Sequence, residues 1–190
     1  MANIDAVFGL RPAKTLGAGY NTSGFSTYKM ATGAGDNIFT GSLVMLQANG
    51  MITIAVDNTT ANILGVCGGF YYDNAQGEPT FGSYWPASTE TYNEADVEVK
   101  VYDDPNTLFE VQSVAGTTGQ AVIGANANAS GNANGSTTSG LSSCYIDAPN
   151  AAATAEQLRI VDVTADVDNN DLSSNNVNLL VRINEHAYTT

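Results

Sequence analysis

The chain contains only six lysine and arginine residues among its 190 residues, and this scarcity restricts the folds that it can adopt. The exposed side of a surface helix is normally built from Lys, Arg, Glu and Gln repeated at helical spacing. Charged residues make up 13% of this chain, which is about half of the usual share in soluble proteins. Hydrophobic residues make up 43%, which is enough for the core of one domain of this length. We therefore predict a domain built from strands and turns.

Eight segments have the apolar pattern of strands. They are residues 38–47, 51–56, 62–72, 96–102, 107–112, 143–147, 158–163 and 177–185. Asn49-Gly50 predicts a hairpin between the first two segments. Pro105, within Asp-Asp-Pro-Asn, predicts a turn between the fourth and the fifth. The pattern predicts an all-β fold with an extended N-terminal arm, and its body is either an antiparallel β-sandwich or a barrel.

Residues 1–30 differ from the rest of the chain in charge and in pattern. They hold three basic residues and one acidic residue, a net charge of +2, whereas the remainder carries −15. Ile4, Phe8 and Leu10 follow neither the period of a strand nor that of a helix. About a dozen extended residues reach roughly 40 Å, far enough to cross a neighbouring subunit. We therefore predict an extended arm over 1–30 and a β-rich body over 31–190.

Residues 124–140 form a low-complexity stretch of Ala, Asn, Gly, Ser and Thr. The stretch offers no large apolar side chain for a core. We therefore predict a surface loop within the body.

The net charge of −13 argues against nucleic acid as a partner, because the field of the chain repels a phosphate backbone. The chain has no stretch of about 18 uninterrupted apolar residues, and its first residues do not read as a signal peptide. We expect a soluble protein that is made in the cytoplasm and binds no membrane.

The residues offer little for catalysis or for cofactors. His186 is the sole histidine, close to the C-terminus, so we predict a packing role for it. Residues 166–171 begin like a calcium loop, but Asp171 and Val177 stand where Gly and Glu are required. Cys67 and Cys144 are predicted to be buried free thiols. We predict no catalytic, metal or cofactor site, and a binding or structural role instead of an enzyme.

Three segments carry a resemblance to a known family. They are Ala2-Asn-Ile-Asp-Ala-Val-Phe-Gly-Leu-Arg-Pro12, Tyr102-Asp-Asp-Pro-Asn-Thr-Leu-Phe-Glu-Val-Gln112 and Leu180-Val-Arg-Ile-Asn-Glu-His186. Together they resemble the head decoration or cement proteins of tailed bacteriophages, especially short-tailed marine and cyanobacterial ones. The similarity runs from end to end of the chain. It departs from the family at Val7, where relatives often carry Pro, which bears on the stiffness of the arm.

The resemblance implies a non-enzymatic structural virion protein on the outer surface of an icosahedral capsid. Such a protein binds the major capsid protein, cements neighbouring capsid subunits and commonly associates with itself as a homotrimer. The resemblance places the partner-binding residues in the arm, at Ile4, Phe8, Leu10, Arg11 and Pro12.

A second interpretation is a tail or fibre module that recognises glycans on the host surface. Aromatic side chains at Tyr71, Tyr72, Tyr84 and Trp85 would then form the glycan site.

Overall fold

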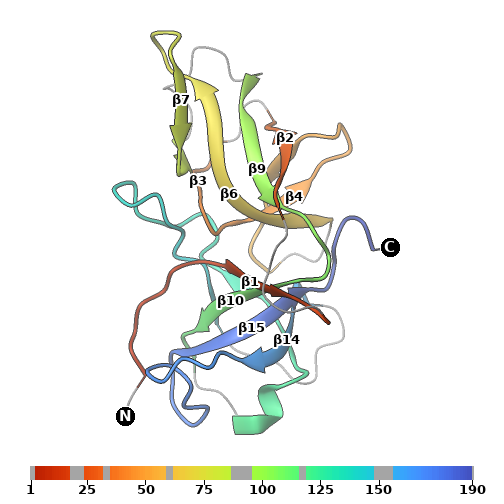
Figure 1. The fold of residues 1–190 in the computed structure, drawn as a ribbon, viewed down its shortest axis with the longest axis vertical. Coiled ribbons are helices and arrows are strands. Elements are labelled where there is room, and N and C mark those ends of the chain that lie inside the picture. The colour runs from red at the N-terminus through yellow and green to blue at the C-terminus, as the bar shows by residue number, and fades with distance from the viewer. Residues whose placement is uncertain are drawn as a thin grey trace.

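The chain folds into strands joined by turns, with one short 3-10 helix, η2 (Gly119–Val122), among the residues described. The structure is a computed structural model that describes residues 3–17, 24–31, 35–58, 62–86, 96–115, 119–147 and 156–189. The prediction of an all-β fold is confirmed. Figure 1 shows two sheet-containing halves stacked along the longest axis of the molecule.

A seven-stranded sheet forms the half in the lower part of Figure 1. Its strands are β1 (Arg11–Thr15), β10 (Thr107–Ser113), β11 (Asn126–Ala127), β12 (Ala129–Ser130), β13 (Tyr145–Ile146), β14 (Leu158–Val163) and β15 (Val177–Ile183). The order is β11-β14-β15-β10-β13-β12, and β1 also pairs with β10. Because only Asn128 separates β11 from β12, the path returns on itself and the sheet is barrel-like.

A six-stranded sheet forms the other half. Its strands are β2 (Ser26–Lys29), β4 (Leu43–Leu46), β5 (Ile52–Ile54), β6 (Ile63–Asp73), β7 (Pro79–Gly82) and β9 (Glu98–Tyr102). The order is β2-β9-β6-β4-β5, with β7 pairing to β6. A bridge between Met30 and Ile52 brings the two ends of this order together. A two-stranded ribbon of β3 (Ile38–Phe39) and β8 (Tyr84–Trp85) lies beside this sheet.

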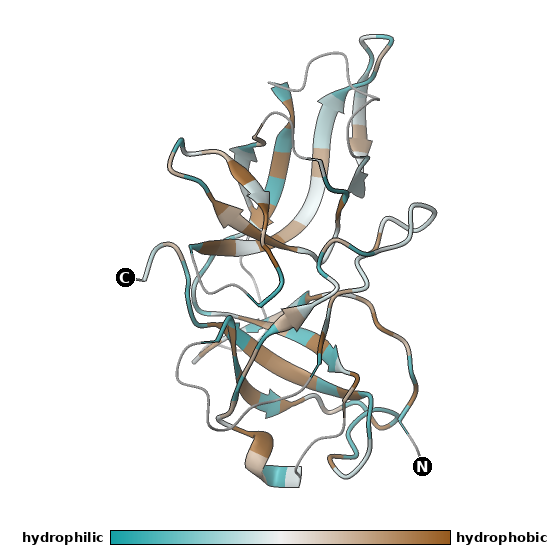
Figure 2. Cartoon of the chain, turned by 180° about the vertical axis from the view of Figure 1, so that it is seen from behind, coloured by the Kyte–Doolittle hydropathy of each residue, from teal (hydrophilic) through white to brown (hydrophobic). Residues whose placement is uncertain are grey.

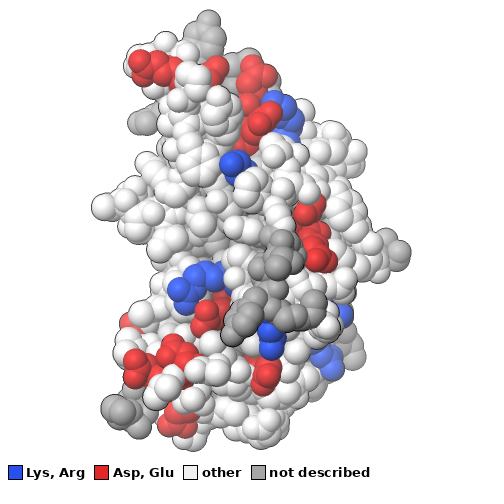
Figure 3. Space-filling view, viewed as in Figure 1, with Lys and Arg blue, Asp and Glu red and all other residues white. Residues whose placement is uncertain are grey.

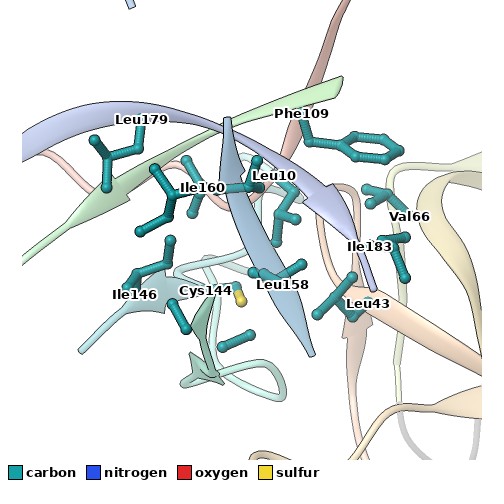
Figure 4. Close-up of a cluster of buried hydrophobic side chains, with 14 of the residues drawn as sticks. Leu10, Leu43, Val66, Phe109, Cys144, Ile146, Leu158, Ile160, Leu179 and Ile183 are labelled. Atoms are coloured by element: carbon teal, nitrogen blue, oxygen red, sulfur yellow. The ribbon is translucent and has the colours of Figure 1, made fainter. Parts of the chain in front are cut away.

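Two hydrophobic cores share one wall, which is the antiparallel pair β4–β6. Leu43 and Val66 face the core of the seven-stranded sheet, where Figure 4 shows them near Leu10. Their neighbours Val44 and Cys67 face the core of the six-stranded sheet. Since successive side chains of a strand point to opposite faces, the continuous apolar runs in these strands supply both cores. Figure 2 shows hydrophobic stretches on strands of both halves.

Both predicted turns are present. The Asn49-Gly50 turn joins β4 to β5, and the Gln47 amide donates to the Met51 carbonyl at 2.9 Å across it. Gly50 has a φ of +78°, a conformation that glycine adopts without strain. The turn around Pro105 has a different role from that of a hairpin, because it leads the chain from β9 in one sheet to β10 in the other.

The structure corrects the prediction that residues 124–140 form a surface loop. Ala125, Ala127 and Ala129 are buried in the core of the seven-stranded sheet, and β11 and β12 lie in this segment. Their methyl groups lie in this core at alternate positions, in keeping with the side-chain period of an extended chain. The longest exposed run of the segment is residues 136–139.

Asn132, from the same segment, bonds to the backbone of Leu43 in β4 and of Ala55, the residue after β5. Its side chain is 1% exposed and donates to the carbonyls of Leu43 and Ala55, both at 2.8 Å. The Asn132 Oδ1 atom accepts from the Leu43 amide at 2.7 Å. Three buried backbone groups therefore bond to one side chain, and of these the Leu43 carbonyl also accepts from the Ala55 amide at 3.0 Å.

We predict that Asn132→Ala lowers the free energy of unfolding by about 3 kcal/mol or more, because buried backbone groups lose their partners. Asn134→Ala is the matched control, since Asn134 is exposed two residues further along the same segment. Urea unfolding followed by circular dichroism measures both variants. Equal stabilities for the two variants would contradict this role of Asn132.

Candidate functional site

The N-terminal segment, residues 3–10, lies against β10 and the loop that precedes β15 in its own chain, and we call it the strap. It is held by hydrogen bonds with side-chain amides and not by a ladder of backbone hydrogen bonds. The Asn3 side chain donates to the carbonyls of Asp171 at 3.0 Å and Asn175 at 2.7 Å. The Gln112 side chain donates to the Ile4 carbonyl at 2.9 Å and accepts from the Ala6 amide at 3.0 Å. The strap is therefore fixed mainly by polar contacts.

The turn that receives Asn3 is itself ordered by hydroxyl groups. The side chains of Ser173 and Ser174 donate to the Asp171 carboxylate at 2.6 Å and 2.9 Å. These hydrogen bonds, led by that from Ser173, hold the pKa of Asp171 below its ordinary value. The Asp171 amide in turn donates to Asn3 Oδ1 at 3.2 Å.

The end of the strap is anchored in the core. Leu10 is 1% exposed, and its amide donates to the Gly41 carbonyl at 2.9 Å. Gly9 has a φ of +75°, and a Cβ atom there would lie 2.8 Å from Ser142 Cβ, so only glycine fits. Beyond Leu10 the chain continues as β1, which pairs antiparallel with β10.

The outer side of the strap presents an aromatic ring beneath a cation. Arg11 Cζ lies 3.7 Å from the centroid of the Phe8 ring. Arg11 Nη2 is also 3.2 Å from Glu110 Oε2, in an ion pair whose arginine side chain is 56% exposed. Ile4, at the other end of the strap, is 54% exposed.

A cleft of about 260 Å³ opens between the strap and the loop that precedes β15. It is lined by Ile4, Ala6, Phe8, Arg11, Gln112, Asp166, Asp168, Asn169 and Asn178. Figure 3, which shares its view with Figure 1, shows acidic and basic groups on both halves of this face of the molecule. Asn178 Nδ2 contacts Asp166 Oδ2 at 3.3 Å, and Asn169 Nδ2 donates to the Ile4 carbonyl at 2.8 Å. Both apolar and polar side chains are therefore available to a partner here.

The structure brings three of the five predicted partner-binding residues to this cleft, namely Ile4, Phe8 and Arg11. Leu10 packs in the core instead, and Pro12 is half-buried in β1 opposite Phe109. The amides that anchor the strap carry no signal in the sequence pattern. Asp166 and Asp168, which belong to the incomplete calcium loop in the sequence, both line the cleft.

The three segments that carry the family resemblance contribute neighbouring strands of one sheet. The first leads into β1, the second contains most of β10, and the third contains the end of β15. Strand β10 pairs with β1 and with β15. The three segments therefore meet at β10.

His186 is a buried packing residue in the structure, 1% exposed. Its Nδ1 atom accepts from the Tyr188 amide at 3.1 Å, and its Nε2 atom has no hydrogen-bond partner among the described residues. Burial lowers the pKa of His186, although the carboxylates of Asp103 and Asp104 oppose this shift.

Cys67 and Cys144 are buried free thiols, as predicted. Burial raises the pKa of Cys67 to about 12 and that of Cys144 further, so neither is a reactive thiolate at neutral pH. Within the described ranges, no three metal-ligating side chains of His, Cys, Asp or Glu come together. Among the described residues, no helix is long enough and apolar enough to cross a membrane.

The four aromatic residues of the glycan interpretation do not form one surface. Trp85 is 3% exposed, and Tyr72 packs edge-on against it with ring centroids 5.7 Å apart. Tyr84 stacks on Phe39, with centroids 5.6 Å apart. Tyr71 alone of the four is among the exposed large side chains, at 44%.

Comparisons of the chain with protein-family models, with curated proteins and with solved structures found no match.

We predict that folding stability falls as the pH decreases from about 7.5 to 6 through the ordinary pKa of histidine. In the unfolded chain, His186 takes up a proton near pH 6.5. In the folded chain, burial keeps the His186 side chain neutral to lower pH. For one proton, the loss approaches at most about 1.4 kcal/mol per pH unit. His186→Asn, whose Oδ1 atom can replace Nδ1 as acceptor, should have a flatter profile in urea unfolding at each pH. Parallel profiles for the two proteins would contradict the prediction.

Proposed function

We propose that the chain is a structural virion protein that binds the outer surface of an icosahedral capsid and cements neighbouring major capsid subunits. It acts by binding and not by catalysis, and it assembles as a homotrimer. The family resemblance of the three segments motivates the proposal. The structural observation that best supports it is the strap, which carries exposed Ile4 and the Phe8–Arg11 pair beside a cleft.

The strap suits a contact surface because its exposed and its anchoring groups are different. Leu10 and the amide contacts of Asn3 and Gln112 fix its course, which leaves Ile4 and Phe8 free of a core role. A partner that covers these side chains removes apolar area from water without unfolding the strap. The arm of this proposal is therefore a fixed ridge on its own subunit.

Several weak contacts in one assembly explain how such a small surface could hold a shell together. A specific interface buries roughly 1,600 Å² in total, which is more than a strap of eight residues offers. In a trimer, three straps act together, because the first contact raises the effective concentration of the others into the millimolar range. A protein that binds the assembled shell alone then stabilises it by mass action.

We predict that the double variant Ile4→Ser/Arg11→Gln reduces retention on capsids at least tenfold. It removes an exposed apolar contact and the cation above Phe8, while the exposed ion pair that it breaks adds at most about 1 kcal/mol to stability. Retention is measured by co-sedimentation of the chain with capsids stripped of it, and mass spectrometry of the particles gives the copy number.

The control is Leu141→Ser, which changes a side chain that is 45% exposed and does not line the strap cleft. Thermal unfolding confirms that all variants are folded. Hundreds of copies per particle and a loss specific to the strap variant support a shell role. Unchanged retention of the strap variant, or only a dozen copies per particle, would reject it.

A further inference from the structure

The six-stranded sheet carries a second exposed surface, away from the strap cleft. Phe81 of β7 is 61% exposed and lies opposite Tyr71 of β6, which is 44% exposed. Phe25, just before β2, is 47% exposed and packs edge-on against Tyr102 of β9. Figure 1 shows β7, β6 and β9 side by side in the upper half of the molecule.

Lys100 occupies the middle of this surface. Its Nζ atom lies 4.6 Å from the centroid of the Phe25 ring and 4.9 Å from that of Phe81. Among the described residues, the ion pairs within 4.0 Å involve Arg11 and Lys29, so Lys100 is held by rings and not by a carboxylate. We call Phe25, Tyr71, Phe81, Lys100 and Tyr102 the aromatic platform.

The backbone beneath the aromatic platform is shaped to seat its rings. A Cβ atom on Gly68 would lie 2.9 Å from Tyr102 Cε2, and one on Gly69 would lie 3.0 Å from Phe81 Cζ. Gly69 has a φ of +142°, and the pairing of β6 with β9 is irregular between Cys67 and Gly69. Glycines within a strand mark close approach of another group, and bulges redirect side chains. The aromatic platform is thus supported by local backbone geometry and is more than a chance exposure of apolar residues.

The size and charge of the aromatic platform define its ligand. It exposes three large apolar side chains, whereas a stable protein interface uses about 20–30 residues on each side. The net charge of −13 repels polyanions. The faces of aromatic rings are electronegative and attract weakly positive C–H groups, such as those on one side of a pyranose ring. The Lys100 ammonium supplies hydrogen-bond donors to hydroxyl groups beside a stacked sugar.

We propose that the aromatic platform binds a neutral saccharide, with sugar rings on Phe25 and Phe81 and a hydroxyl group on Lys100. This site differs from the aromatic set expected from the sequence, because it includes Tyr71 but not Tyr72, Tyr84 or Trp85. It goes beyond the proposed capsid role and shares no residue with the strap. Each proposal can therefore fail without the other.

The test is affinity electrophoresis and calorimetry of the full chain with neutral hexasaccharides of glucose, mannose, galactose and xylose. We expect at least one to bind, with an affinity that changes little between about 50 and 500 mM salt, because no ion pair forms. Phe81→Leu, which removes the ring but keeps an apolar side chain, should weaken binding at least tenfold. Lys100→Met, which keeps the stem but removes the donors, should do the same.

Leu141→Ser is the matched control and should bind as the unchanged chain does. The strap variant Ile4→Ser/Arg11→Gln should also keep saccharide binding, which separates this test from that of the capsid role. Failure of every hexasaccharide to bind, or binding that survives both platform variants, would overturn the proposal. Self-association of the chain that the same two variants abolish would also overturn the proposal, because the aromatic platform would then be a protein interface. Salt-sensitive binding of polygalacturonate alone would likewise overturn it.

Discussion

The fold depends on one pair of strands that has no solvent-facing side over most of its length. β4 and β6 bury alternate side chains in two different cores, so neither core is complete without them. This dual use explains why residues 63–67 are apolar without interruption, a pattern more often expected of a parallel sheet. It also explains Gly65, because a Cβ atom there would overlap the carbonyl oxygen of Tyr102 where β9 crosses. The two halves therefore share their stability, and a defect in the common wall affects both cores.

Strands built from large apolar residues could be predicted from the sequence, and strands built from small residues could not. β9, β10, β14 and β15 follow from their valines, leucines and isoleucines, and the Asn49-Gly50 turn fixed the hairpin between β4 and β5. The alternation of alanine with polar residues over 125–130 was equally regular, but alanine has little hydrophobic weight by itself. Whether these alanines are buried depends on how the seven-stranded sheet returns on itself, and that is set by strands far away in the chain.

The candidate site was also predictable only in part. The apolar residues of the N-terminal segment were recognisable because they stand out from polar surroundings, and Ile4, Phe8 and Arg11 do lie together on the surface. What holds them was not predictable, because the anchoring amides of Gln112 and Asn169 lie more than 100 residues away in sequence. Non-periodic apolar residues are consistent both with an arm that leaves the subunit and with a strap that stays on it. The burial of Leu10 decides between these for the structure described, because that side chain fills space inside its own core.

The two surfaces singled out above have a common electrostatic feature. In a chain with six basic residues, two of these residues lie over aromatic rings, Arg11 over the half-buried Phe8 and Lys100 between the exposed Phe25 and Phe81. A cation above a ring covers apolar surface with its stem and adds a favourable interaction with the ring face. At the same time it opposes the field of the surrounding carboxylates at that point. At the strap, the Arg11 guanidinium offsets part of the charge of Glu110, Asp166 and Asp168, which lie around it. The positions of Arg11 and Lys100, more than the number of cations, therefore distinguish the two surfaces for which we propose contacts.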